Sequence, residues 1–303
     1  MPKTLNSQPR AHITKGSVDV EGRTRTYTLA APPDGNADSL LLVFHGSKQT
    51  GEKFRAFTGY SFDAPAATGN TVVAYLDGYK NQWNDARKAS NFPARTENIN
   101  DVAFAKAMID LLSGSHRIDR SRVYAAGYSN GGAMVIRLIH EIPGSLAGAA
   151  ILAATQPAPE NFLGTGAPAA PLPVLLMHGT RDHIVPYAGG LMSWWVRLVF
   201  RVGGRALSAE RTAAYFAARN KITVPAITTT LPHDKKSGKT SVTRTDFQQD
   251  GKPPVVLYSV HGGGHTIPGP AKAPFVLGAT SHDVNTADVL GEFFGLTSPR
   301  TRQ

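Results

Sequence analysis

A serine flanked by glycines is the first feature of this chain that could carry chemistry. Residues 127–131 read Gly-Tyr-Ser-Asn-Gly, after the apolar run 123–126 and before the helix-patterned segment 133–139. A serine between a strand and a helix is the setting of a nucleophile elbow, which exposes the hydroxyl at the strand's end. The turn is so tight that side chains at Gly127 and Gly131 would collide with the neighbouring helix and strand. We predict that Ser129 is a nucleophile; the alternative is a serine that caps a helix.

A serine nucleophile needs a neutral imidazole to take its proton as it attacks a carbonyl. His265 lies in the glycine-rich segment 261–266, directly after the apolar run 255–260. Asp182 follows the apolar run 174–177 and would hold the imidazole in the required tautomer. The order Ser, Asp, His along the chain is that of α/β-hydrolases. Asp283 and His261 are the rival acid and base.

The tetrahedral intermediate of such a reaction needs donors for its oxyanion. The residue after the nucleophile, Asn130, would offer one backbone N–H. The second is expected from the loop after an early strand, where the chain reads His45-Gly46-Ser47. We predict Ser47 as that donor and place Gly46 and His45 beside the substrate, because glycine lets the backbone approach it closely.

Two further segments have open interpretations. Residues 76–100 form a long irregular stretch, in which Trp83 would either stack on an aromatic or sugar group of the substrate or pin the loop to the core. Residues 192–201 would form either a lid or acyl-binding wall, or a packed helix with an exposed basic edge.

His261 and His265 could suggest a zinc pair, but the three glycines between them argue against a shared helix face. We predict no metal and no cofactor.

The elements that must position these residues follow from the apolar pattern. Residues 17–31 alternate around Glu21-Gly22, which predicts an opening hairpin. Strands buried on both faces are predicted at 40–44, 71–75, 123–126, 149–153, 174–177 and 255–260. Helical faces are predicted for Val102, Ala105, Ile109 and Leu112, for Ala214, Phe216 and Ala217, and for Val289, Leu290, Phe293 and Phe294 with Gly295 as the stop.

Strands that alternate with helices predict an α/β fold with a mostly parallel sheet covered by helices on both faces. Ligands of such sheets bind beyond the carboxyl ends of the strands, which is where the candidate residues stand. With 303 residues and 41% apolar residues, we expect a single catalytic domain over 1–303, with flexible termini at about 1–16 and 297–303. The Pro/Gly/Ala-rich stretch 163–173 is expected to be a surface loop.

Composition limits the partners. A net charge of +10 raises the possibility of a nucleic-acid partner, but the basic residues are scattered without interleaved aromatic residues, so we predict no nucleic-acid partner. Attraction to an acidic polysaccharide stays open.

The chain has no cysteine, which excludes disulfides and a cysteine nucleophile. Residues 1–8 lack the apolar core of a secretory signal, and no segment has the apolar length of a membrane span, so a cytoplasmic location is expected.

Four segments together resemble the polyhydroxybutyrate depolymerase, feruloyl esterase and acetylxylan esterase family of α/β-hydrolases. They are His-Gly-Ser at 45–47, Gly-Tyr-Ser-Asn-Gly-Gly-Ala-Met at 127–134, His-Gly-Thr-Arg-Asp at 178–182 and Gly-Gly-His-Thr-Ile-Pro-Gly at 263–269. The resemblance runs from about residue 18 to 294. It implies metal-free hydrolysis of carboxylic esters, with Ser129, Asp182 and His265 as nucleophile, acid and base. Many relatives have cysteine in place of Ser47 and tryptophan in place of Ile267, and many are exported.

The sequence therefore predicts a serine esterase that works through an acyl-enzyme. Its expected substrate is a polyester or oligoester of the polyhydroxyalkanoate type, or a feruloyl or acetyl ester of a plant polysaccharide. An acyltransferase or peptidase could use the same three residues. A non-catalytic relative that binds acidic glycans is the alternative outside enzymes.

Overall fold

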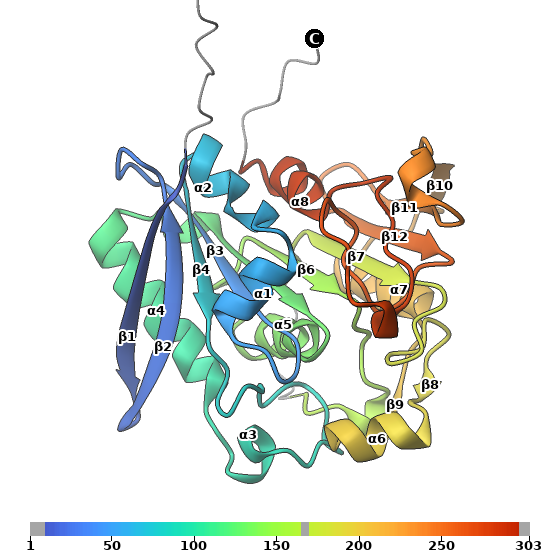
Figure 1. Cartoon of the computed structure of the whole chain (residues 1–303), viewed down its shortest axis with the longest axis horizontal. Coiled ribbons are helices and arrows are strands. Elements are labelled where there is room, and N and C mark those ends of the chain that lie inside the picture. Colours follow the sequence, from blue (N-terminus) through green and yellow to red (C-terminus); the bar gives the residue numbers. More distant parts are fainter. Residues whose placement is uncertain (1–9, 165–169, 297–303) are drawn as a thin grey trace, which may run out of the picture.

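The computed structural model describes residues 10–164 and 170–296, and within them ten strands form one sheet (Figure 1). In spatial order the strands are β1 (His12–Val20), β2 (Arg23–Ala31), β4 (Thr71–Leu76), β3 (Ser39–Phe44), β5 (Val123–Tyr128), β6 (Gly148–Leu152), β7 (Val174–Gly179), β12 (Val255–His261), β11 (Ser241–Phe247) and β10 (Ile227–Thr230). The predicted surface loop 163–173 lies partly outside the described residues, and the predicted flexible end 297–303 lies wholly outside them.

The centre of the sheet is parallel and its two margins are antiparallel. Strands β4, β3, β5, β6, β7 and β12 run in parallel, whereas β1 and β2 on one side and β11 and β10 on the other pair antiparallel. Every residue of β3 to β7 is buried, which explains why these strands read as unbroken apolar runs. All six predicted strands are present, and the α/β fold class is confirmed.

The predicted opening hairpin is confirmed, with one correction. Glu21 and Gly22 both have positive φ, at 54° and 75°, as a two-residue hairpin turn requires. However, β1 begins at His12, which pairs with Ala31, so residues 12–16 are strand rather than part of a flexible terminus. Most of β1 is exposed at the edge of the sheet. The first residues of β1 were therefore missed, because the prediction relied on apolar residues that become buried.

Helices cover both faces of the sheet. On one face lie α4 (Asp101–His116), α5 (Asn130–Glu141) and α7 (Ala209–Arg219), and on the other lie α1 (Gly51–Phe57), α2 (Ala64–Thr68) and α8 (Thr286–Phe294). Alternate residues of β3 point to opposite faces: Leu40 and Leu42 pack in the first core, Leu41 and Val43 in the second. Both cores hold the strands in register, so the strand ends present their loops at one edge.

The predicted helix faces are confirmed for α4 and α8, and α8 ends at Gly295 with φ at 64°. In α7 the prediction was wrong by one residue: Ala214 is exposed, and Ala213 is buried with Phe216 and Ala217. Residues three and four apart share a helix face, which fits 213, 216 and 217. A run of adjacent alanines gave no signal to choose between the two positions.

Candidate active site

Loops from the carboxyl ends of β5, β7 and β12 bring the three predicted catalytic residues together. The Ser129 Oγ lies 2.9 Å from Nε2 of His265, and Nδ1 of His265 lies 2.6 Å from Oδ2 of Asp182. His265 and Asp182 are buried, whereas Ser129 borders a pocket. These contacts form one continuous hydrogen-bonded chain from a hydroxyl at the surface of the pocket to a buried carboxylate.

The turn that carries Ser129 has the close packing expected from its glycines. Ser129 adopts φ 56° and ψ −116°, a backbone conformation that L-residues rarely adopt. A Cβ on Gly127 would overlap the carbonyl of Gly131, and a Cβ on Gly131 would overlap the carbonyl of Phe44 in the neighbouring strand. The fold therefore needs glycine on both sides of Ser129 in order to hold the turn.

Three hydrogen-bond donors and a nearby histidine hold Asp182 as a carboxylate. Its Oδ1 accepts the N–H groups of Ile184 and Val185 at 2.8 Å each, and its Oδ2 accepts from His265 and lies 3.3 Å from Nε2 of His178. Burial alone would raise the pKa of Asp182, but the nearby His265 and the hydrogen bonds from both histidines outweigh it and hold that pKa well below its ordinary value. An ionised acid at this place orients His265.

The rivals of Asp182 and His265 contact other residues. Asp283 accepts the N–H of Asp234 at 2.7 Å, and His261 is exposed at the end of β12, where it pairs with Thr243 at 2.8 Å. Sequence reasoning missed two supporting residues. The hydroxyl of Tyr128 donates to the carbonyl of His265 at 2.6 Å, and His178 donates to the carbonyl of Val185 at 2.8 Å. Both lie within motifs quoted from the sequence, at 127–134 and 178–182, but only their contacts reveal their supporting role.

His45 is not a substrate contact, contrary to the prediction, because its side chain is fully buried. Its Nδ1 donates to the carbonyl of Gly46 at 2.7 Å, and its Nε2 accepts the N–H of Gly78 at 2.9 Å. The carbonyl of Gly46 and the N–H of Ser47 belong to one trans peptide and point in opposite directions. By holding that carbonyl, His45 turns the Ser47 N–H away from itself.

Gly46, Ser47 and Asn130 border the same pocket as Ser129. Within the described residues, neither the N–H of Ser47 nor that of Asn130 donates a hydrogen bond. Two unused backbone donors beside a serine hydroxyl are what a developing oxyanion needs. The role of these two residues as oxyanion donors stays a prediction.

Trp83 is also not a substrate contact, because it is fully buried. Its indole N–H donates to the carbonyl of His45 at 2.9 Å, and its ring meets Phe44 edge to face at 5.0 Å. Of the two interpretations of this residue, the one that pins the loop to the core is correct. The long loop 77–92 is thereby anchored beneath the site.

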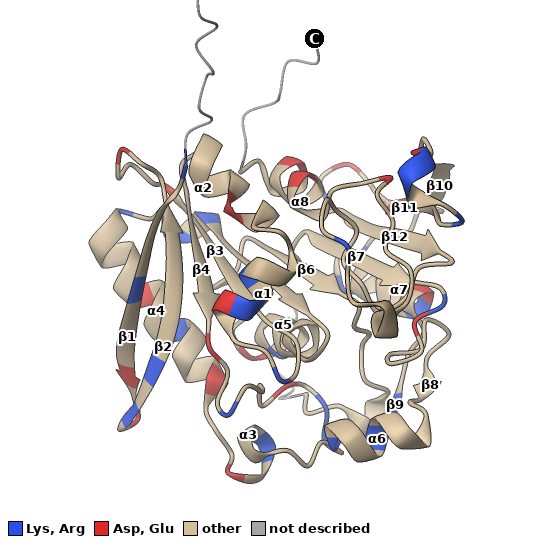
Figure 2. Ribbon diagram, in the orientation of Figure 1, with Lys and Arg blue, Asp and Glu red and all other residues tan. Residues whose placement is uncertain are grey.

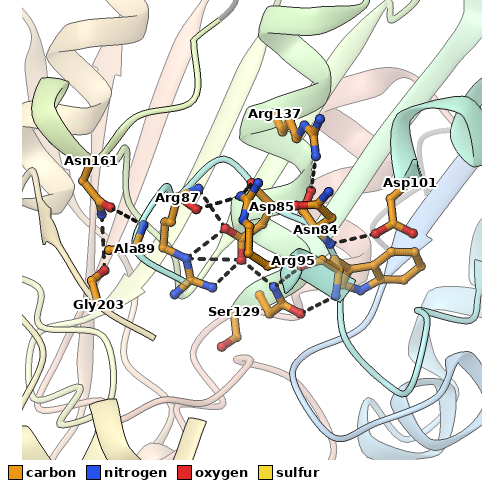
Figure 3. Close-up of polar contacts among 12 residues, drawn as sticks. Asn84, Asp85, Arg87, Ala89, Arg95, Asp101, Ser129, Arg137, Asn161 and Gly203 are labelled. Carbon is orange, nitrogen blue, oxygen red and sulfur yellow. Dashed lines mark hydrogen bonds and ion pairs between the residues drawn. The ribbon is translucent and has the colours of Figure 1, made fainter. Parts of the chain in front are cut away.

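A buried polar network joins this loop to the nucleophile turn (Figure 3). The Asn130 side chain accepts the N–H of Trp83 at 2.8 Å and donates to the carbonyl of Trp83 at 3.1 Å and to Asp85 at 2.6 Å. Asp85 pairs with Arg87, and Arg95 donates to the backbone carbonyls of both. Asn130, which lines the pocket, is therefore fixed by its side chain, and its backbone N–H takes no part in this network.

The wall of the pocket is largely apolar. Helix α6 (Trp194–Phe200) and the loops after β7 and β12 supply most of its apolar side chains, and Gln49 and Arg87 are polar members of the lining. The segment 192–201 is thus helical and also forms a wall, so each of its two interpretations is partly correct. The apolar lining residues are Ile184, Val185, Met192, Val196, Phe200, Val202 and Leu277.

This chain is similar to a known protein family. The model of the family described as phospholipase/carboxylesterase matches residues 31–194, more than half of the chain. The chain belongs to the phospholipase/carboxylesterase family. The predicted ester hydrolase function is therefore confirmed.

Relatives within the family are esterases by name. The protein described as "Putative esterase NocK" from Nocardia uniformis subsp. tsuyamanensis is 32% identical over 293 residues, covering 93% of this chain and 83% of that protein. Feruloyl esterase B from Piromyces equi is 29% identical over 164 residues; these cover 51% of this chain and 28% of that longer protein. The predicted resemblance to feruloyl esterases is confirmed.

A solved structure supports the fold over almost the whole chain. The acetyl xylan esterase from Aspergillus awamori superposes with a TM-score of 0.59 at 13% identity, covering 94% of this chain and 100% of that one. At this level of identity the likeness concerns the fold alone, and it confirms the α/β-hydrolase fold.

Two buried histidines lead to a prediction about acid stability. Burial lowers the pKa of His45 to about 4 and that of His140 to about 4, from an ordinary 6.5. As the pH falls from 6.5 to 4, the unfolded chain takes up these protons before the folded chain does, so stability is lost with falling pH. We expect each histidine to cost about 2 kcal/mol between pH 7 and pH 5.

Denaturant unfolding at the two pH values measures this loss. The variant His140→Gln keeps a side chain that can hydrogen-bond to Tyr215, the partner of His140 at 2.8 Å, but cannot titrate. We expect the variant to lose about 2 kcal/mol less than the wild type over this pH interval. An equal loss in both proteins would contradict the assignment.

Proposed function

We propose that this ester hydrolase is a serine esterase with Ser129 as nucleophile, His265 as general base and Asp182 as the acid that orients it. The observation that carries the proposal is the unbroken chain of hydrogen bonds from Ser129 through His265 to Asp182, at 2.9 and 2.6 Å, beside a pocket. The low pKa of Asp182 adds support, because an ionised acid stabilises the imidazolium that forms.

In the proposed reaction, the Ser129 Oγ attacks the ester carbonyl while its proton passes to Nε2 of His265. The carbonyl oxygen becomes an oxyanion and accepts the N–H groups of Ser47 and Asn130. Collapse of this intermediate breaks the bond to the alcohol, which leaves with the proton from His265. Water then gives a proton to His265 as it attacks the acyl-enzyme, and collapse of the second intermediate releases the acid while His265 returns the proton to the Ser129 Oγ.

The pocket favours an ester with an apolar or aromatic acyl group. Its wall is made largely of aliphatic side chains with Phe200, and burial of such a group is favourable by about 25 cal/mol per Å². Hydroxyalkanoate oligoesters and feruloyl esters both meet this description. The named activity of the feruloyl esterase relative supports the second of them.

A panel of short, long and hydroxycinnamoyl esters tests the proposal. We expect turnover by the wild type and covalent labelling of Ser129 by a fluorophosphonate. Water and an added alcohol compete for the acyl-enzyme, so the product ratio separates hydrolysis from acyl transfer, and a matched amide tests for peptidase activity. A folded protein that neither labels nor turns over any ester would favour the glycan-binding alternative.

The variant Asn130→Ala tests the anchoring of the oxyanion donor. It keeps the backbone N–H but loses the hydrogen bonds to Trp83 and Asp85. Since loss of one oxyanion donor costs about 100- to 1,000-fold in kcat, we expect a misplaced donor to cost roughly 10- to 100-fold, with KM little changed. Steady-state kinetics on one soluble ester measures both constants.

Asn220→Ala is the matched control. Asn220 is a buried asparagine that also bridges backbone groups, those of Leu172 and Pro253, outside the pocket. It should lower stability and leave kcat near the wild-type value. Equal kcat losses in the two variants would show that Asn130 acts through stability alone.

A further inference from the structure

Large apolar side chains are exposed on two segments of the described chain. On α6, Trp194 is 72% exposed and Leu198 is 73% exposed; in the turn 275–277, Phe275 is 95% exposed and Val276 is 73% exposed. We call these four residues the mouth patch. Single exposed apolar residues are common, but a group of this size usually marks an interaction site.

The mouth patch belongs to two segments that also line the candidate active site. Helix α6 supplies Val196 and Phe200 to the pocket wall, and the turn supplies Leu277. The same two short segments therefore face the pocket with some side chains and solvent with the others. Whatever covers the mouth patch therefore contacts two segments that line the pocket.

The surroundings of the mouth patch are basic. The segments 183–209 and 251–282 contain no aspartate or glutamate. Figure 2 shows blue but no red on α6. Lys48, which is exposed, also lies here, with its ammonium 5.0 Å from the Phe200 ring. The exposed cations of these two segments include Arg197, Arg201, Arg205 and Lys272.

We propose that the mouth patch docks the enzyme on the surface of an anionic lipid bilayer. Exposed aromatic and aliphatic side chains flanked by cations are the features by which proteins lie in the headgroup region of a membrane. Cations at such a surface are attracted to anionic lipid headgroups. No helix within the described residues is long and apolar enough to cross a bilayer, so the contact is peripheral.

Charge favours the bilayer over a second copy of this chain. Face-to-face pairing of two mouth patches would oppose Arg197 and Arg201 of one copy to basic residues of the other, and like charges at an interface are unfavourable. Anionic headgroups meet the same side chains with opposite charge. Docking would also place the pocket opening against the membrane, where apolar esters collect.

Vesicle binding by Ser129→Ala protein tests docking without any turnover, so the result does not depend on the proposed catalytic role. We expect binding to mixed vesicles of phosphatidylcholine and phosphatidylglycerol and little binding to phosphatidylcholine alone. The chain has three tryptophans, and Trp83 is already buried. A blue shift of emission on binding would therefore report Trp194 and its half-exposed neighbour Trp195.

Two pairs of surface variants separate the apolar and basic contributions. We expect the triple variant Trp194→Ser, Leu198→Ser, Phe275→Ser to weaken binding at least tenfold. The control Ile227→Ser, which removes a 71% exposed residue on β10, should leave binding unchanged. Reversal of Arg197 and Arg201 to glutamate should likewise weaken binding at least tenfold. The matched reversal of Lys235 and Lys236 should have a smaller effect. In a Ser129-containing background, all variants should keep wild-type hydrolysis of a dissolved short ester.

Three results would overturn the proposal. The first is failure of the Ser129→Ala protein to bind anionic vesicles at about 0.15 M salt. The second is equal vesicle binding by the triple variant at Trp194, Leu198 and Phe275 and by the Ile227→Ser control. The third is a wild-type protein that is dimeric in solution and a triple variant that is monomeric, which would assign the mouth patch to a second copy of the chain.

Discussion

Replacement of Ser129 by alanine is expected to lower kcat by about a millionfold on any ester that the wild type hydrolyses. The reason is chemical, because no other hydroxyl stands 2.9 Å from Nε2 of His265 among the described residues. Fluorophosphonate labelling should also disappear. Progress curves at high enzyme concentration, with thermal unfolding as the check on folding, measure the loss.

The double variant Ser129→Ala, His265→Ala sharpens this test. Nucleophile and base act as one unit, so the double variant should be about as slow as either single variant, not slower by the product of the two losses. Multiplying losses would mean that the two side chains act independently. Retention of most activity in either single variant would rule out the proposed mechanism.

The second large effect is expected for Asp182→Asn, with a loss of about 10,000-fold in kcat. The Oδ1 of asparagine can still accept from Ile184 and Val185, so the loop should keep its shape. Its amide, however, would donate toward Nδ1 of His265 and so fix the proton on Nε2. That tautomer cannot accept the proton of Ser129.

Asp283→Asn is the matched control. Asp283 was the rival acid, and its carboxylate accepts the N–H of Asp234 at 2.7 Å. Its replacement should leave kcat on the same soluble ester within a factor of about two of wild type, because its carboxylate contacts Asp234 and His233 and does not line the pocket. Equal effects of the two substitutions would argue against Asp182 as the orienting acid.

Position along the chain predicted the candidate triad because the strands are so clearly marked. Nearly continuous apolar runs identified β5, β7 and β12, and the candidate catalytic residues follow each run within a few residues. In a parallel sheet the carboxyl ends of strands meet at one edge, so nearness of Ser129, Asp182 and His265 could be expected. The residue order added independent support.

Trp83 and His45 could not be placed in the same way. An aromatic residue and an imidazole both bind substrates and both fill polar cores, and the choice depends on neighbours distant in the sequence. Trp83 meets the carbonyl of His45, and His45 meets the N–H of Gly78. The signal for Trp83 was the irregular loop 76–100 and that for His45 was the segment 45–47 after a strand, and neither says which side chains point inward.

The segment 192–201 shows a related limit. The helix α6 carries apolar residues on every side, so no amphipathic pattern indicated which of its side chains face the pocket. Val196 is buried, whereas Leu198, two residues later, is largely exposed. Only the tertiary packing separates the two, and the same packing creates the exposed apolar group at the entrance.

The backbone at Ser129 has a consequence for how this enzyme could evolve. A non-glycine residue in such a conformation costs about 1–3 kcal/mol, and glycine would adopt it at little cost. Serine is therefore retained here against a standing pressure for stability. A descendant released from selection for catalysis would gain stability by the exchange of Ser129 for glycine, so a glycine at this position in a related lineage would be the mark of an abandoned activity.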